Sequence, residues 1–129
     1  MNDDELFNFF FDKNSFHYEL VEECMWSIEK YWVLEKKLID TIKDLHNKDT
    51  ISKNLARNLY YLSHSIQSLI QCSLSENDLF EIENLDFESI LYYRDRLDLI
   101  INILWNNHNY RDYNDFFLEN PKYVAHRLG

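Results

Sequence analysis

The sequence predicts an all-α fold: one domain over residues 1–129, a bundle of three long helices with short helices at both ends. Two observations predict this class. Apolar residues recur at spacings of three and four along three long segments, which is the period of a helix with one buried face. The chain also contains a single glycine and a single proline, whereas tight hairpins and phosphate-binding loops need glycine. A β-rich fold or a nucleotide-binding loop is therefore not expected.

Residues 3–11 begin with three acids and continue as an aromatic run. Acidic residues favour the N-terminus of a helix, so we expect a short helix or hooked arm here. Asn14 or Ser15 can cap the helix that follows, because both side chains accept hydrogen bonds from free backbone amides. The side chains that should lie on the body are Leu6, Phe7, Phe10 and Phe11.

A single long helix is expected over residues 15–46, and three of its residues depart from a simple amphipathic pattern. Glu35 lies within the apolar stripe, where a lone carboxylate would be costly. We expect a buried ion pair, with Arg94 as the partner; a general acid with a raised pKa is the alternative interpretation. Trp26 and Val33 fall on the opposite, charged face. The stripe itself comprises Cys24, Met25, Ile28, Tyr31, Trp32, Leu38, Ile39 and Ile42.

Two further long helices are expected, over residues 50–72 and 86–106, capped by Asp49 or Thr50 and by Asp86. The second helix should bury one face, and the third is apolar on two sides, as in a helix packed between neighbours. In the acidic connection over residues 73–85, Phe80 and Ile82 should hold the loop down while Glu81 and Glu83 face water. A last short helix is expected before Pro121. The core face of the second helix is Ile51, Leu55, Leu59, Leu62, Ile66, Leu69 and Ile70.

The net charge of −10 favours basic partners over nucleic acid or anionic membranes. The charge is uneven, because residues 50–75 contain no acid and only two bases, Lys53 and Arg57. The N-terminus is acidic where a signal peptide would be basic, and no apolar run is long enough to cross a bilayer. We therefore expect a cytoplasmic protein, with Cys24 and Cys72 reduced and unpaired.

The histidines are scattered one per region, so we expect no metal site. We also expect no cofactor and no catalytic residue. One enzymatic alternative stays open. Arg57 and His64 are seven residues apart on one helix face, in an arrangement that resembles the Arg–His signature of helical ribonucleases of bacterial defence systems. There, the two side chains act on the scissile phosphate. An acidic chain is, however, a poor RNA binder.

Three segments resemble the immunity protein 41 family: KYWVLE at Lys30–Glu35, NDLFEIENL at Asn77–Leu85 and YYRDR at Tyr92–Arg96. The resemblance covers roughly residues 26–105 and is strongest over 76–101. Proteins of this family neutralise toxins delivered by polymorphic-toxin and contact-dependent growth inhibition systems. The resemblance implies a toxin-binding protein that is not an enzyme. Members face different toxins, so it carries over no binding residue.

The sequence thus predicts an immunity protein that binds the C-terminal domain of a cognate toxin, a basic domain and in particular a nuclease. An acidic inhibitor can compete for the surface that nucleic acid would use. A ribonuclease and an acidic adaptor without a toxin are the alternatives, and the oligomeric state is left open. The candidate toxin-binding residues form two patches: Glu22, Trp26, Glu29 and Val33 on the back of the long helix, and Asp78, Glu81 and Glu83 in the connecting loop. Trp26 packed under the N-terminal arm is the competing interpretation.

Overall fold

The structure, a computed structural model, describes residues 2–75, 80–106 and 109–123. These residues form an all-α bundle, as predicted, and no strand occurs among them. No helix in the described ranges is long and apolar enough to cross a membrane. The helices are α1 (Asp3–Phe11), α2 (Phe16–Glu23), α3 (Ile28–Leu45), α4 (Lys53–Leu74), α5 (Phe87–Asn106), a 3-10 turn η1 (Tyr110–Tyr113) and α6 (Asn114–Leu118).

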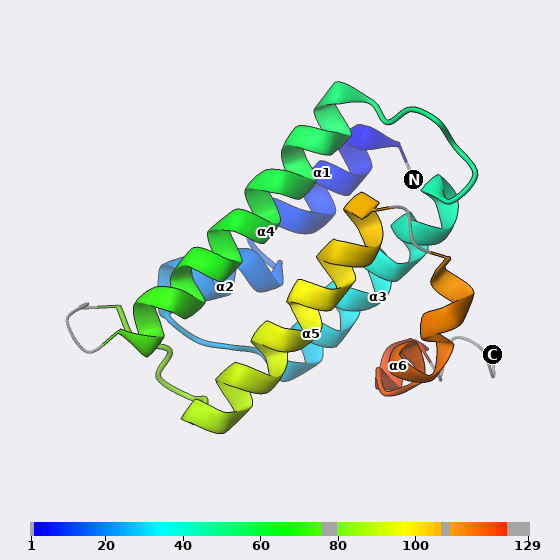
Figure 1. Cartoon of the computed structure of the whole chain (residues 1–129). Coiled ribbons are helices and arrows are strands. Elements are labelled where there is room, and N and C mark those ends of the chain that lie inside the picture. The colour runs from blue at the N-terminus through cyan, green and yellow to red at the C-terminus, as the bar shows by residue number, and fades with distance from the viewer. Residues whose placement is uncertain (1, 76–79, 107–108, 124–129) are drawn as a thin grey trace.

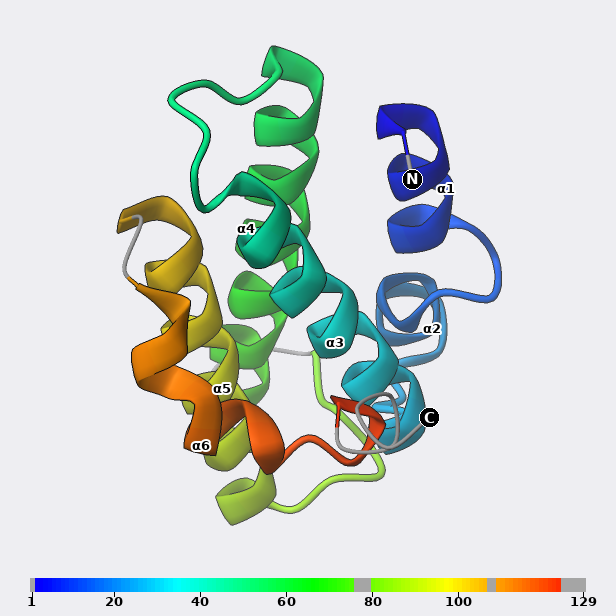
Figure 2. The ribbon, with the colours of Figure 1, turned by 90° about the vertical axis from the view of Figure 1, so that its right-hand side faces the viewer.

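The three long helices α3, α4 and α5 lie side by side, with α5 packed against both of the others. The short helices α1 and α2 follow one another along the remaining edge of the bundle, where α1 contacts α4 and α2 contacts both α3 and α4 (Figure 2). The tail, η1 with α6, runs along the outside of the α3–α5 pair (Figure 1). This arrangement leaves the outer side of α4 uncovered by any helix of the described chain.

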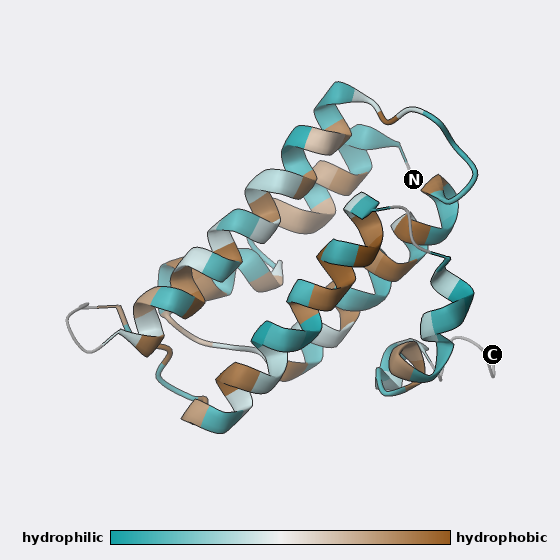
Figure 3. Ribbon diagram, in the orientation of Figure 1, coloured by the Kyte–Doolittle hydropathy of each residue, from teal (hydrophilic) through white to brown (hydrophobic). Residues whose placement is uncertain are grey.

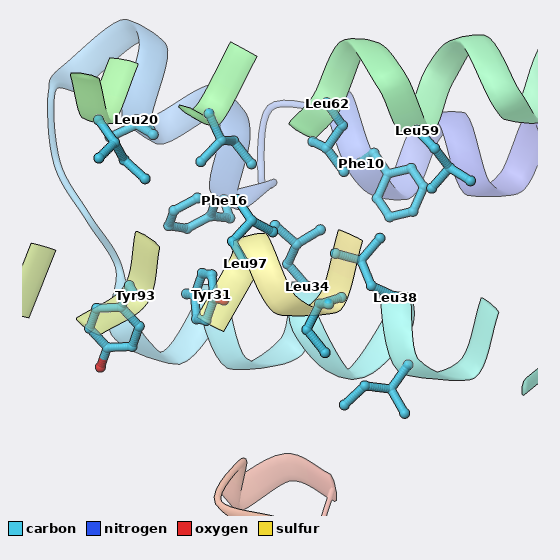
Figure 4. Packing of buried hydrophobic residues seen from close by; sticks show 14 of the residues in the cluster. Phe10, Phe16, Leu20, Tyr31, Leu34, Leu38, Leu59, Leu62, Tyr93 and Leu97 are labelled. Atoms are coloured by element: carbon cyan, nitrogen blue, oxygen red, sulfur yellow. The ribbon is translucent and has the colours of Figure 1, made fainter. Parts of the chain in front are cut away.

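One continuous core holds these helices together. Leu59 and Leu62 of α4 point toward Leu34 and Leu38 of α3, and Leu97 of α5 belongs to the same cluster (Figure 4). Each fully buried side chain of this kind contributes about 1.5–3 kcal/mol relative to an exposed one. Hydrophobic and hydrophilic segments alternate along α4 and α5, as expected for helices with one buried side (Figure 3).

The helix starts follow capping chemistry. Ser15, Ser27 and Ser52 each accept a hydrogen bond from the backbone amide three residues on and cap α2, α3 and α4. Asp86 does the same for Ser89 at the start of α5, as predicted. For α4 the predicted caps Asp49 and Thr50 are wrong, because the helix begins only after Ser52. The predicted core face of α4 is confirmed: Leu55, Leu59, Leu62, Ile66 and Ile70 are buried, and Ile51 and Leu69 pack against the core.

The prediction of a single helix over residues 15–46 is wrong, because the helix is interrupted between α2 and α3. Cys24 ends α2 in the left-handed region, with φ of 57°. The side chain of Asn84 then bonds both backbone groups of Trp26, accepting from its N–H and donating to its carbonyl, each at 2.8 Å. These long-range bonds satisfy backbone groups that would otherwise need helical partners. The turn swings the Trp26 side chain into the core.

The terminal helices and α5 agree with the predictions in most respects. The short N-terminal helix is confirmed, with Leu6 and Phe10 buried, yet Phe7 stays largely exposed. Helix α5 packs between α3 and α4, as expected. Of its expected second apolar side, Ile103 is buried and Leu99 packs against the core, whereas Tyr92 is 44% exposed. The short helix before Pro121 is confirmed as α6.

Candidate functional site

A charged pair lies at the centre of the molecule. Glu35 of α3 is fully buried, and Arg96 of α5 is 2% exposed. The guanidinium of Arg96 donates from Nη2 to Glu35 Oε1 at 2.6 Å and from Nε to Glu35 Oε2 at 3.0 Å. This two-bond geometry is the strong form of an arginine–carboxylate pair. The predicted burial and pairing of Glu35 are therefore confirmed, but the predicted partner is wrong. Arg94 points away and pairs with its neighbour Asp95.

Further groups complete this pair. The Tyr31 hydroxyl donates to Glu35 Oε2 at 2.8 Å, and Arg96 Nη1 donates to the half-exposed Glu119 at 2.6 Å. Arg96 Nη2 also donates to the Phe116 carbonyl at 3.2 Å, and the guanidinium lies 3.9 Å from the centre of the Phe116 ring. Buried charges need such satisfied surroundings, because an incomplete polar network destabilises a fold.

The titration behaviour follows from this environment. Burial raises the pKa of Tyr31 well above its ordinary value, and the adjacent Glu35 carboxylate raises it further. Burial alone would lower the pKa of Arg96, but the hydrogen bonds and the charge of Glu35 outweigh it and raise that pKa. Tyr31 is therefore a neutral donor and Arg96 a fixed cation. Because Glu35 has no access to solvent, we interpret the pair as a structural clamp and not as a general acid.

Residues from all three segments that resemble the immunity protein 41 family lie at this clamp or at the turn beside it. Tyr31 and Glu35 come from the first segment, Asn84 from the second, and Tyr93 and Arg96 from the third. Tyr93 packs on Tyr31 with ring centres 5.0 Å apart, and Asn84 fixes the turn at Trp26. These five side chains therefore have structural roles in the fold, while Glu81 and Glu83 of the second segment face solvent.

Trp26 was expected on an exposed face, and that expectation is wrong. Its side chain is fully buried, and its ring centre lies 4.6 Å from Phe16, 5.4 Å from Tyr31 and 5.4 Å from Tyr93. The competing interpretation, a core position, holds, although the contacts are with Phe16 of α2 and not with the phenylalanines of α1. Trp26 cannot reach a partner without unfolding this cluster.

The other residues of the first patch do face solvent. Glu22 and Glu29 are exposed, and Val33 is 37% exposed. Val33 and Glu29 line a surface groove of about 410 Å³ between the α1–α2 turn and α3, whose apolar floor includes Phe9 and Phe16. Most charges at the groove are paired, because Glu29 pairs with Lys122 at 3.1 Å and Lys30 pairs with Glu19 at 3.0 Å, and Asp12 adds a further carboxylate to the lining. This patch keeps its exposed residues but loses its aromatic anchor.

The second patch is held firmly on the surface. Ile82 is buried, and its N–H donates to Ser73 Oγ at 3.0 Å. The N–H of Glu83 donates to the carbonyl of Cys24, also at 3.0 Å. Glu81 and Glu83 face solvent on either side of Ile82, as predicted. Asp78 lies outside the described residues.

The structure extends this second patch beyond the predicted residues. Asp86, Phe87 and Glu88 follow at the start of α5, all exposed, and the Phe87 side chain is 60% exposed. Two hydrogen bonds from Ser89 hold the pKa of Asp86 below its ordinary value, which keeps this carboxylate charged. An exposed aromatic between two carboxylates was missed in the sequence. Phe87 lies three positions before Ile90 and therefore on the apolar stripe of its helix. The local pattern gave no signal of its exposure.

The residues of the ribonuclease alternative lie on the outer side of α4. Arg57 donates to Asn54 Oδ1 at 2.6 Å. The His64 ring stacks on Tyr60, with centres 5.5 Å apart and planes 9° apart. Both side chains are exposed, and each contacts a neighbour on its own helix.

Neither Cys24 nor Cys72 is joined in a disulfide, and both are half-buried. Within the ranges 2–75, 80–106 and 109–123, no group of three or more histidine, cysteine or acidic side chains is placed to hold a metal ion.

A scan against protein-family models, a search of curated proteins and a search of solved structures each return no match.

Proposed function

We propose that this protein is a cytoplasmic immunity protein that neutralises a cognate toxin by binding its basic domain. One observation carries the proposal: residues 81–88, which lead into α5, expose the four carboxylates of Glu81, Glu83, Asp86 and Glu88 together with the ring of Phe87. Carboxylates of this kind steer a basic partner into contact, and a large aromatic is a typical source of binding energy.

The anchoring of this surface supports the proposal. Residues 82 and 83 are bonded to α4 and to the α2–α3 turn, and Asn84 is bonded to Trp26. A surface fixed before binding loses little conformational entropy when the partner docks. The net charge of −10 acts in the same direction, because it raises the encounter rate with a basic domain.

Growth protection tests this function. The protein is expressed in a sensitive strain together with the toxin domain encoded beside it, and growth is compared with that of cells expressing the toxin alone. The proposal expects wild-type protein to restore growth. The triple variant Glu81→Lys, Glu83→Lys, Glu88→Lys should lose protection. A control with the same charge change, Asp44→Lys, Asp112→Lys, Asp115→Lys, alters exposed acids far from the loop in sequence and should protect.

Other outcomes would favour the alternatives. If the purified protein cleaves RNA and His64→Ala abolishes the cleavage, the ribonuclease alternative replaces the proposal. If wild-type protein gives no protection against a toxin domain that is active in the same cells, the protein is not its immunity partner, and the acidic adaptor becomes the better account.

A further inference from the structure

The outer side of α4 differs in charge from the rest of the molecule. In a chain of net charge −10, helix Lys53–Leu74 carries no acid, and its only charged side chains are Lys53 and Arg57. The same side exposes two large aromatics, Tyr60 at 62% and Tyr61 at 56%. Exposed aromatic surface of this kind marks an interaction site more often than a solvated face.

Neighbouring helices extend this surface on both sides. Phe7 of α1 is 47% exposed, and its ring centre lies 5.0 Å from that of Phe11. The ring centre of Phe11 in turn lies 5.4 Å from that of Tyr61. On the α5 side, Tyr60 and Trp105 line a shallow groove of about 300 Å³. Asp98 is the acid in that groove, and Gln67 donates a hydrogen bond to it at 2.7 Å.

The distribution of charge favours a second copy of the chain as the partner that covers the outer side of α4. Two copies of a protein with a net charge of −10 repel each other on most approaches. The outer side of α4 is where two copies can meet without opposing carboxylates on the contacting helices. A basic partner, by contrast, gains nothing there, because the fixed charges of α4 are positive.

The spacing of the exposed residues suits a two-fold axis. Arg57, Tyr61, His64 and Ser68 are separated by four, three and four positions, all are exposed, and they form one stripe. This spacing reads the same in both directions, and its midpoint lies near the middle of α4. When two such helices run antiparallel, each position of the stripe therefore meets another position of the same stripe.

We propose that this stripe is the interface of a homodimer, with the two α4 helices antiparallel about a two-fold axis between residues 62 and 63. Tyr61 then packs against His64 of the partner subunit, and Arg57 lies opposite Ser68 of the partner subunit. No two like charges face each other in this register, whereas a parallel pairing would set Arg57 against its own copy. The proposal does not depend on the toxin-binding function.

Cysteine cross-linking tests the register. Cys24→Asn and Cys72→Ala first remove the native thiols; Asn tolerates the left-handed backbone at position 24. Arg57→Cys and Ser68→Cys are then made separately in this background, and circular dichroism checks each fold. In the antiparallel register the two Arg57 positions are 11 residues apart along the axis, about 16 Å at 1.5 Å per residue. That separation is far beyond disulfide reach.

The two cysteine variants are then mixed. Mild oxidation of this mixture should give a disulfide-linked dimer, while Arg57→Cys alone and Ser68→Cys alone should stay monomeric on a non-reducing gel. Arg57→Cys linking to itself while the mixture does not would overturn the register.

Analytical ultracentrifugation of the wild-type chain tests the dimer itself. Added salt should strengthen association, because it screens the repulsion between two acidic copies. Tyr61→Asp should raise the dissociation constant about tenfold or more. The control Val21→Asp, on the exposed side of α2, should leave it unchanged. A wild-type chain that stays monomeric at all protein and salt concentrations, or equal effects of the two variants, would overturn the proposal.

Discussion

Arg96 and Glu35 are 61 positions apart in the chain and share two hydrogen bonds, the shorter at 2.6 Å. This pair joins α3 to α5, and the remaining donors of the guanidinium extend the junction to Phe116 and Glu119 in the tail. One side chain therefore connects three parts of the chain that are distant in sequence. The Glu35 carboxylate among its partners is fully buried.

Removing either member of this pair should strongly destabilise the fold. Glu35→Ala leaves the Arg96 cation buried without its main partner, and Arg96→Met leaves the Glu35 carboxylate in the same state. Breaking a buried pair in this way typically costs about 3–5 kcal/mol. Urea unfolding measures the loss. Arg94→Met serves as the control, because its pair with Asp95 is on the surface and contributes about 1 kcal/mol or less.

The double variant Glu35→Leu, Arg96→Met should cost less than the sum of the two single changes, because no isolated charge remains. Additive losses would show that the two residues do not act as a pair.

Trp26 should be required for stability. Trp26→Ala removes the largest fully buried side chain, and such a cavity costs about 3–5 kcal/mol. Trp26→Phe should cost much less, because the indole Nε1 has no hydrogen-bond partner among the described residues and an unpaired buried donor is itself unfavourable. Thermal unfolding of both variants gives the comparison. A stable Trp26→Ala protein would contradict the buried position.

His17 should make the protein less stable in mild acid. Its side chain is buried next to Phe11 and Tyr61, its Nε2 lies 2.8 Å from Ser65 Oγ, and burial lowers its pKa. The unfolded chain binds a proton first as the pH falls, so stability is complete above about pH 6.5 and declines below it. The urea midpoint measured as a function of pH should show this slope. His17→Gln should flatten the slope, and the exposed His64→Gln should keep it.

Tyr31 should make the stability of the fold decline in alkali, whereas His17 makes it decline in acid. Because its pKa in the folded protein is raised, the unfolded chain loses its tyrosine proton first, above about pH 10. Stability should therefore be complete below that pH and fall above it. Tyr31→Phe lowers stability at neutral pH through the lost bond to Glu35 but should flatten the alkaline decline. Tyr18→Phe, on the exposed side of α2, should leave the decline unchanged.

Phe87 should contribute binding energy with little effect on folding, since its ring is 60% exposed. In the proposed complex, Phe87→Ala should weaken toxin binding by about 2 kcal/mol. Calorimetry with the toxin domain measures this loss, and thermal unfolding of the free variant should match wild type. Ile28→Ala, a change at another exposed apolar residue of the bundle, should alter neither quantity.

The sequence predicted those features that follow from local patterns. The apolar period of α4, the cap at Asp86 and the alternation around Ile82 depend on neighbouring residues, and all three match the structure. The burial of Glu35 was predictable for the same reason, since its position in the stripe is a local property.

Features set by distant residues could not be predicted in this way. The break at Cys24–Ser27 depends on Asn84, 58 positions away from Trp26, and no period within the helix pattern reveals it. The choice of Arg96 over Arg94 depends on the rotation of α5 relative to α3. The exposure of Phe87 depends on where α5 emerges from the bundle. In each case tertiary packing overrides the local pattern.

We propose that the acidic surface at residues 81–88, with Phe87, binds a basic toxin domain. The most direct test of this proposal is the association rate with that domain, measured from low to physiological salt. The association rate should fall as the salt concentration rises, because salt screens the attraction between the carboxylates and the basic domain. The rate should also fall for Glu81→Lys, Glu83→Lys, Glu88→Lys and stay close to wild type for Asp44→Lys, Asp112→Lys, Asp115→Lys. A salt-independent association rate that is the same for wild type and both triple variants would show that this acidic surface does not bind the toxin domain.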